Sequence, residues 1–230
     1  PITKYLEHNA EQFGNDCALV ELNPEVRDTR RMTWKEYDLT QPEPNLPYRR
    51  EISWKIFNEK ANRCAHYLLE RGVHPGDKVG ILMMNCLEWL PIYFGILKTG
   101  AIAVPLNFRY ASDEIDYCLN LADISVLFFG PEFIGRLEAI SDKIIAHRLL
   151  IYVGEGHEPT FSENYVMSAM NYSSENLNIE ISDDDYGAIY FSSGTTGFPK
   201  AILHKHGALM HSCACEQNHH GQKKDDVFLC

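Results

Sequence analysis

The chain of 230 residues is short of positive charge: 21 lysines and arginines stand against 32 aspartates and glutamates, for a formal net charge of −11. An acidic surface repels phosphate backbones and anionic headgroups, which argues against nucleic acid and anionic membranes as partners. Long apolar runs are also lacking, because the longest one, 86–97, is too short to span a bilayer. Residues 1–13 show no basic start followed by an apolar run, so we expect neither a transmembrane segment nor a signal peptide.

The sequence has no disulfide framework. Its seven cysteines are an odd number without a repeating spacing, and several lie in apolar segments, where the thiol acts as a small hydrophobic group. This usage indicates a reducing compartment, and we expect a cytoplasmic location.

A standard zinc-binding spacing is missing as well. Histidines and cysteines gather between His204 and His220, and His211 and Cys215 would share one face of a helix. Because the spacing fits no usual zinc pattern, we expect no metal there. We expect His206 to open the helix that follows residue 205, and the other members to be surface or local core residues.

What the sequence does contain is an alternation of apolar strands and helices. Unbroken runs of Val, Ile, Leu and Phe between helical segments predict an α/β fold, in which a parallel sheet is flanked by helices on both faces. The expected strands are 17–22, 78–84, 101–106, 124–129 and 148–153, with another beginning at residue 188. The expected helices are 2–13, 53–71, 85–98, one from residue 112, 132–140 and a short one at 165–172.

Capping signals mark several of these helices. Ser53 is expected to cap its helix, and Asn85 with Glu88 has the spacing of a capping box. Ser112 is the expected cap of a helix whose first turn carries acidic residues, which suit the helix dipole. Pro91 is expected to kink the helix that contains it.

Composition also suggests how the chain is divided. Residues 23–50 hold four prolines and two pairs of arginines, which predicts an exposed Pro-rich excursion. Residues 154–182 are polar and irregular, so we expect a first subdomain over 1–182. The start of a second subdomain is expected over 183–230, with a last strand at 226–230.

The most informative segment follows the strand that begins at residue 188. Gly194 and Gly197 allow close backbone approach to a ligand, and successive N–H groups there can form an anion-binding nest. Lys200 adds a compact positive charge suited to phosphate, and no other lysine or arginine occurs between Arg148 and Lys200. Hydroxyl donors come from Ser192, Ser193, Thr195 and Thr196. Eight acids fill the interval before Lys200: Glu155, Glu158, Glu163, Glu175, Glu180, Asp183, Asp184 and Asp185.

Composition alone leaves a second interpretation of this segment, a flexible loop between two strands. A P-loop NTPase is rejected, because that motif needs G-x-x-x-x-G-K-[ST], whereas the glycines here are three apart and Ala201 follows the lysine. The dinucleotide fingerprint G-x-G-x-x-G is also absent.

Residues 192–200 resemble the phosphate-binding signature of adenylate-forming enzymes, which include acyl-CoA synthetases, luciferases and peptide-synthetase adenylation domains. Ala201, where the family usually has glycine, is one departure. Two further stretches, 52–62 and 97–107, are similar to family segments in the same order, and Asn107 and Arg109 favour the acyl-CoA synthetase branch. The resemblance covers about residues 50–230.

The resemblance implies a two-step reaction with a small-molecule carboxylic acid, ATP, Mg²⁺ and CoA. The carboxylate attacks the α-phosphate of ATP to give an acyl-adenylate and pyrophosphate, and CoA then displaces AMP. By the same resemblance Thr195, Thr196, Gly197 and Lys200 hold the β- and γ-phosphates. Ser192, Ser193 and Gly194 shape the loop.

Other groups of the family's active site do not occur in this sequence. These are the glutamate that binds Mg²⁺, the aspartate that binds ribose, and the carboxy-terminal domain with its catalytic lysine. We therefore expect the chain to be the amino-terminal portion of an ATP-dependent acyl-CoA synthetase, inactive alone. An aryl-CoA ligase, another adenylating enzyme, and a non-catalytic nucleotide-binding or split-half module are the alternatives.

Overall fold

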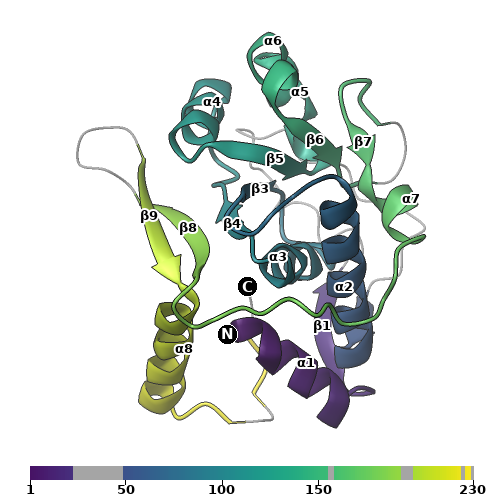
Figure 1. The fold of residues 1–230 in the computed structure, drawn as a ribbon, viewed down its shortest axis with the longest axis vertical. Helices are drawn as coiled ribbons and strands as arrows, with labels where there is room; N and C mark the ends of the chain where they lie inside the picture. Colours follow the sequence, from purple (N-terminus) through teal and green to yellow (C-terminus); the bar gives the residue numbers. More distant parts are fainter. Residues whose placement is uncertain (23–48, 155–157, 193–198, 224–225, 229–230) are drawn as a thin grey trace, which may run out of the picture.

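The computed structural model describes residues 1–22, 49–154, 158–192, 199–223 and 226–228 (Figure 1). The helices of these residues are α1 (Ile2–Gln12), α2 (Trp54–Glu70), α3 (Trp89–Lys98), α4 (Ser112–Leu121), α5 (Ile134–Glu138), α6 (Ser141–Ile144), α7 (Tyr165–Ala169) and α8 (His206–His220). The strands are β1 (Cys17–Leu22), β2 (Arg49–Ser53), β3 (Lys78–Leu82), β4 (Ile102–Pro105), β5 (Ile124–Phe129), β6 (Leu149–Tyr152), β7 (Glu163–Asn164), β8 (Tyr186–Ser192) and β9 (Lys200–Lys205). None of these helices is long and apolar enough to cross a bilayer.

A seven-stranded sheet in the order β7-β6-β5-β3-β4-β8-β9 forms the centre of the molecule. Its strands run parallel except for β9, which is antiparallel to β8. Figure 1 shows α2 and α3 on one side of this sheet and α4, α5 and α6 on the other. The predicted α/β fold, a parallel sheet flanked by helices, is confirmed. A separate antiparallel pair, β1 and β2, lies against α2.

Two apolar clusters fill the space between the sheet and its two helical layers. On one face Val79 and Ile81 of β3 pack with Ile92 and Ile96 of α3. On the other face the alternate strand residues pack with α4 and α5, and Leu82 is one of them. Strands that are buried on both faces need apolar side chains at successive positions. This burial explains the unbroken apolar runs in the sequence.

The helix starts confirm one capping prediction and correct another. Ser53 caps α2, and its hydroxyl accepts a hydrogen bond from the N–H of Ile56 at 3.3 Å. Glu88 does not complete a capping box. It stands at the N-cap of α3 without a side-chain capping bond and forms an ion pair with Lys60 instead.

Two further predictions about helices were wrong. Pro91 lies in the first turn of α3, where its missing N–H has no intrahelical partner to lose, so α3 continues to Lys98. Ser112 is the first residue of α4 rather than its cap. The N-cap is Ala111, whose N–H donates to the carboxylate of Glu114 at 2.9 Å.

Other boundaries also differ from expectation. The helix expected over 132–140 is divided into a 3-10 turn and α5. Of the predicted excursion 23–50, residues 23–48 lie outside the described residues, and Arg49 and Arg50 open β2. Residues 226–228 form no strand.

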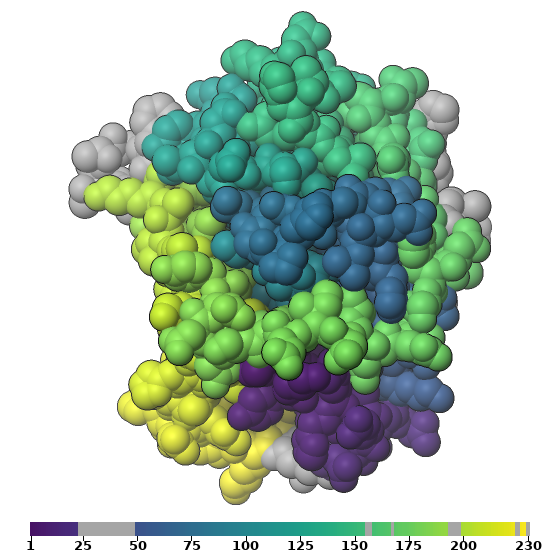
Figure 2. Space-filling view, in the orientation of Figure 1, coloured from purple at the N-terminus to yellow at the C-terminus, as the bar shows by residue number. Residues whose placement is uncertain are grey.

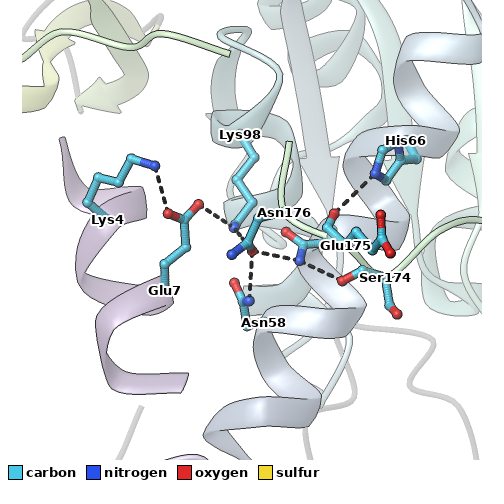
Figure 3. Close-up of polar contacts among 9 residues, drawn as sticks. Lys4, Glu7, Asn58, His66, Lys98, Ser174, Glu175 and Asn176 are labelled. Carbon is cyan, nitrogen blue, oxygen red and sulfur yellow. Dashed lines mark hydrogen bonds and ion pairs between the residues drawn. The ribbon is translucent and has the colours of Figure 1, made fainter. Parts of the chain in front are cut away.

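Residues 173–182 form a strap that runs across α2 and α3 to β8. Figure 2 shows it as a band between the amino-terminal helix and α2. In Figure 3, the side-chain oxygen of Asn176 accepts from Asn58 at 3.0 Å, from Asn62 at 2.9 Å and from Lys98 at 3.4 Å. Lys98 also pairs with Glu7 of α1 at 2.9 Å. One buried polar cluster therefore joins α1, α2, α3 and the strap.

Candidate functional site

The segment that resembles a phosphate-binding signature connects β8 to β9. Its two ends are described: Ser192 is the last residue of β8, Lys200 is the first of β9, and the two are direct register partners. Ser192 is half-buried and Lys200 is exposed. The other predicted site residues, Ser193, Gly194, Thr195, Thr196 and Gly197, lie outside the described residues.

The direction of β8 decides where these two ends lie. Strand β8 is parallel to β4 through the pair Ala103 and Ala188, so Ser192 lies at the edge where β3, β4, β5 and β6 also end. In α/β sheets, ligands bind outside the carboxyl ends of the strands, next to the point where successive connections go to opposite faces. The Ser192–Lys200 pair therefore lies at the edge where this rule expects a ligand.

The change of face occurs between β3 and β4. Helix α3, which follows β3, packs in the first apolar cluster, whereas α4, which follows β4, packs in the second. The residues that follow β3 and β4, 83–88 and 106–111, therefore flank the crevice. Strand β8 is the next neighbour of β4, so Ser192 is one strand away from this point.

Asn107 and Arg109 belong to the turn after β4. The Asn107 side-chain oxygen accepts from the N–H of Arg109 at 2.9 Å, and its backbone oxygen accepts from the N–H of Tyr110 at 3.0 Å. Asn107 thus fixes the turn that carries Arg109, and the guanidinium of Arg109 lies 5.4 Å from the Phe108 ring centroid. The structure brings this turn to the same edge as Ser192.

Arg136 supports the same turn, and sequence reasoning missed it. From α5 its guanidinium donates to the backbone oxygens of Phe108 at 2.7 Å and Tyr110 at 3.2 Å. This arginine is 26 residues or more away in sequence from the groups it contacts, and no sequence spacing reveals the contact, because only the fold brings α5 to the turn after β4.

The charges around Lys200 differ from those around the other lysine of β9. Lys205 pairs with Asp184 at 3.0 Å, an interaction that raises the pKa of Lys205. Lys200 makes no ion pair with any residue that the structure describes. The ammonium group of Lys200, a residue at the carboxyl edge, is therefore available to bind an anionic ligand. A charge-assisted hydrogen bond of this kind contributes about 1.5–3 kcal/mol.

The histidine–cysteine segment forms β9 and α8, and His206 opens α8 as predicted. The Nε2 atom of His211 lies 3.5 Å from the Sγ atom of Cys215, and both side chains are exposed. Across the described ranges, no three His, Cys, Asp or Glu side chains come together in a way that could hold a metal ion.

Known proteins resemble the chain in family, sequence and fold. The family model described as "AMP-binding enzyme" matches residues 6–230. A medium/long-chain-fatty-acid–CoA/3-oxocholest-4-en-26-oate–CoA ligase of Mycolicibacterium smegmatis is 31% identical over 161 residues, which are 68% of this chain and 29% of that protein. The chain thus spans less than a third of the length of this curated relative.

Solved structures extend the similarity to the fold. The anthranilate CoA ligase AuaEII, in complex with anthranoyl-AMP, shares 26% identity and a TM-score of 0.73, over 89% of this chain and 34% of the ligase. A long-chain-fatty-acid-CoA ligase from Archaeoglobus fulgidus shares 20% identity and a TM-score of 0.78, over 98% of this chain and 40% of that one. The second comparison shows a shared fold only.

Proposed function

Because the chain belongs to the AMP-binding enzyme family, we propose that it is the amino-terminal portion of an ATP-dependent acyl-CoA synthetase. The proposed reaction joins a carboxylic acid to the α-phosphate of ATP, releases pyrophosphate, and then transfers the acyl group to the thiol of CoA. The observation that carries the proposal is the pairing of Ser192 with Lys200 at the carboxyl edge of the sheet, inside the family's phosphate-binding signature.

In this proposal the chain holds the pyrophosphate end of ATP. Lys200, with Thr195, Thr196 and Gly197, contacts the β- and γ-phosphates, and Ser192, Ser193 and Gly194 shape the backbone around them. Such a site contributes position and charge neutralisation rather than covalent chemistry. Residues 1–182 would be the first subdomain, and 183–230 the start of the second.

The further partners are a small-molecule carboxylic acid and CoA, and the proposed location is the cytoplasm. Among the described residues no three His, Cys, Asp or Glu side chains come together to hold Mg²⁺, so we assign no step of this chain to the metal. The similarity to a fatty-acid ligase favours an aliphatic acid, whereas the similarity to an anthranilate ligase favours an aromatic one.

The site is tested by measuring MgATP binding to the chain by titration calorimetry. Lys200→Ala should weaken binding about 10- to 150-fold, the range that corresponds to losing one charge-assisted hydrogen bond. Lys205→Ala is the matched control, because Lys205 lies at the other end of β9 and pairs with Asp184. Equal affinities of wild type and Lys200→Ala would contradict the assignment.

A second measurement addresses catalysis. The purified chain, incubated with MgATP, CoA and a panel of fatty and aromatic acids, should bind ATP without releasing pyrophosphate. Binding one end of the nucleotide stabilises ground and transition states alike, which does not accelerate the chemical step. Pyrophosphate release at the rate of a complete acyl-CoA ligase would mean that this chain supplies all the catalytic groups.

A further inference from the structure

Strand β8 carries Ser192, and the ladder that pairs it with the parallel sheet is short. A single register pair, Ala103 with Ala188, joins it to β4, whereas β3 pairs with β5 over most of its length. The outer neighbour β9 is exposed at every position except His204. Side-chain contacts outside the strand ladder also help to fix the position of β8.

One such contact is a hydrogen bond between two tyrosine hydroxyls. The Tyr93 oxygen of α3 lies 2.8 Å from the Tyr190 oxygen of β8, the usual length for an O–H···O bond. Tyr93 is 6% exposed, and its ring stacks on Trp89 with centroids 5.6 Å apart. Tyr190 is 36% exposed, and its ring lies 5.4 Å from the His204 ring. The buried Tyr93 is therefore the fixed partner, and the more exposed Tyr190, with the strand that carries it, is the part it holds.

The register shows which face of β8 is held. Residues two apart on a strand point to the same face, and direct antiparallel partners share a face. Tyr190 and Ser192 therefore project on one side of β8, together with Lys200, the partner of Ser192. The hydroxyl pair lies on the same face as both described ends of the phosphate segment.

The pair also keeps its protons at neutral pH. Burial raises the pKa of Tyr93 well above its usual value, and burial raises the pKa of Tyr190 as well. One hydroxyl can thus always donate to the other. The nearby Cys213 of α8 adds a further upward influence on the pKa of both hydroxyls.

We propose that Tyr93 and Tyr190 are positioning residues, whose hydroxyl bond holds β8 against α3 so that Ser192 and Lys200 present a preformed site to the phosphates of ATP. This inference rests on the proposed function. Neither tyrosine touches the nucleotide in this proposal; each acts through the strand that bears the site.

The test uses Tyr93→Phe, Tyr190→Phe and the double variant, with MgATP affinity measured by titration calorimetry and thermal stability by circular dichroism. Each single variant should weaken MgATP binding about three- to tenfold, the factor expected for one hydrogen bond. The double variant should be no weaker than the worse single variant, since all three break the same bond. Tyr186→Phe is the matched control, because Tyr186 is an exposed tyrosine of the same strand.

The outcomes separate the two proposals. If the wild-type chain does not bind MgATP, the proposed function fails and this inference fails with it. If wild type binds and the tyrosine variants lose only thermal stability while their affinity stays unchanged, the pair is merely structural and the inference alone is overturned. Additive losses of affinity in the double variant would likewise overturn it, because two independent contacts would then be at work.

Discussion

Strands β3 to β6 are buried on both faces, whereas β9 and α8 have one fully buried side chain between them, that of His206. Figure 1 shows the same contrast in outline: the parallel sheet lies between two helical layers, and the β8–β9–α8 arm extends from one edge. The arm nevertheless carries the residues of the candidate site. Packing energy and the proposed chemistry are thus concentrated in different parts of the chain.

The two regions make different contributions to the molecule. The sheet body supplies stability and fixes the carboxyl edge, because each of its strands buries apolar side chains toward both helical layers. The arm supplies the exposed Lys200 and depends on a few specific contacts for its position. Substitutions in the two regions should therefore produce separable effects on stability and on ligand binding.

The largest expected effect is a cavity in the sheet body. Phe128 of β5 is fully buried, and Phe128→Ala should lower the free energy of unfolding by about 3–5 kcal/mol. Leu203 of β9 is 43% exposed, and Leu203→Ala should change the free energy of unfolding by no more than about 0.5 kcal/mol. Urea denaturation of both variants measures the contrast. Equal losses would show that the arm is packed as tightly as the body.

A smaller effect is expected from the polar cluster beneath the strap. Lys98 and Lys4 both bind the carboxylate of Glu7, at 2.9 Å and 2.7 Å, but Lys98 is 3% exposed and Lys4 lies in solvent. Lys98→Met should cost about 1.5–3 kcal/mol, because Asn176 and Glu7 lose a buried charged donor. Lys4→Met should cost no more than about 1 kcal/mol, as usual for an exposed pair.

The same pair of variants has a second readout, the pKa of Glu7. Burial acts to raise it, but the hydrogen bonds from Lys4 and Lys98 outweigh burial and lower it. Removing Lys98 should therefore raise the pKa of Glu7, which NMR titration of the carboxyl group can follow. Identical stabilities of the two methionine variants would show that burial of Lys98 is not what makes the contact matter.

Much of the sheet body could be predicted from the sequence, because apolar runs and capping residues act locally. The strand over 124–129 and the Ser53 cap are confirmed. Predictions failed where a distant partner decides. Glu88 has the right spacing for a cap, yet Lys60 takes its carboxylate, and Pro91 was expected as a kink although only its place in the first turn matters.

The candidate site was predictable in the same uneven way. Glycine spacing and a solitary lysine suggest a phosphate segment, and the resemblance of residues 192–200 to a family signature favours it over a flexible loop; the phosphate contacts stay a prediction. The supports of the site could not be identified. Arg136 and the pair Tyr93 and Tyr190 act across elements that only the folded sheet brings together.

The smallest effect concerns the one buried side chain of α8, His206, which packs against Gly187 of β8. His206 is fully buried, neither ring nitrogen has a hydrogen-bond partner among the described residues, and the ring packs where a Cβ on Gly187 would lie 3.1–3.2 Å away.

Burial lowers the pKa of His206, and the amino group of Pro1 lowers it further, while Asp185 and Asp183 act in the opposite direction. The unfolded chain, in which histidine titrates near 6.5, therefore takes up this proton at a higher pH than the folded chain does. Stability from His206 is complete above about pH 6.5 and falls as the pH drops toward the lowered folded pKa, by at most about 1.4 kcal/mol per pH unit for one proton.

Urea denaturation between pH 7.5 and 5.5 should show a steeper loss for wild type than for His206→Gln, because the variant cannot take up the proton. If wild type and His206→Gln lose stability in parallel as the pH falls, His206 is protonated equally in the folded and unfolded chain. Its buried site would then tolerate a charge that the core of the sheet body cannot.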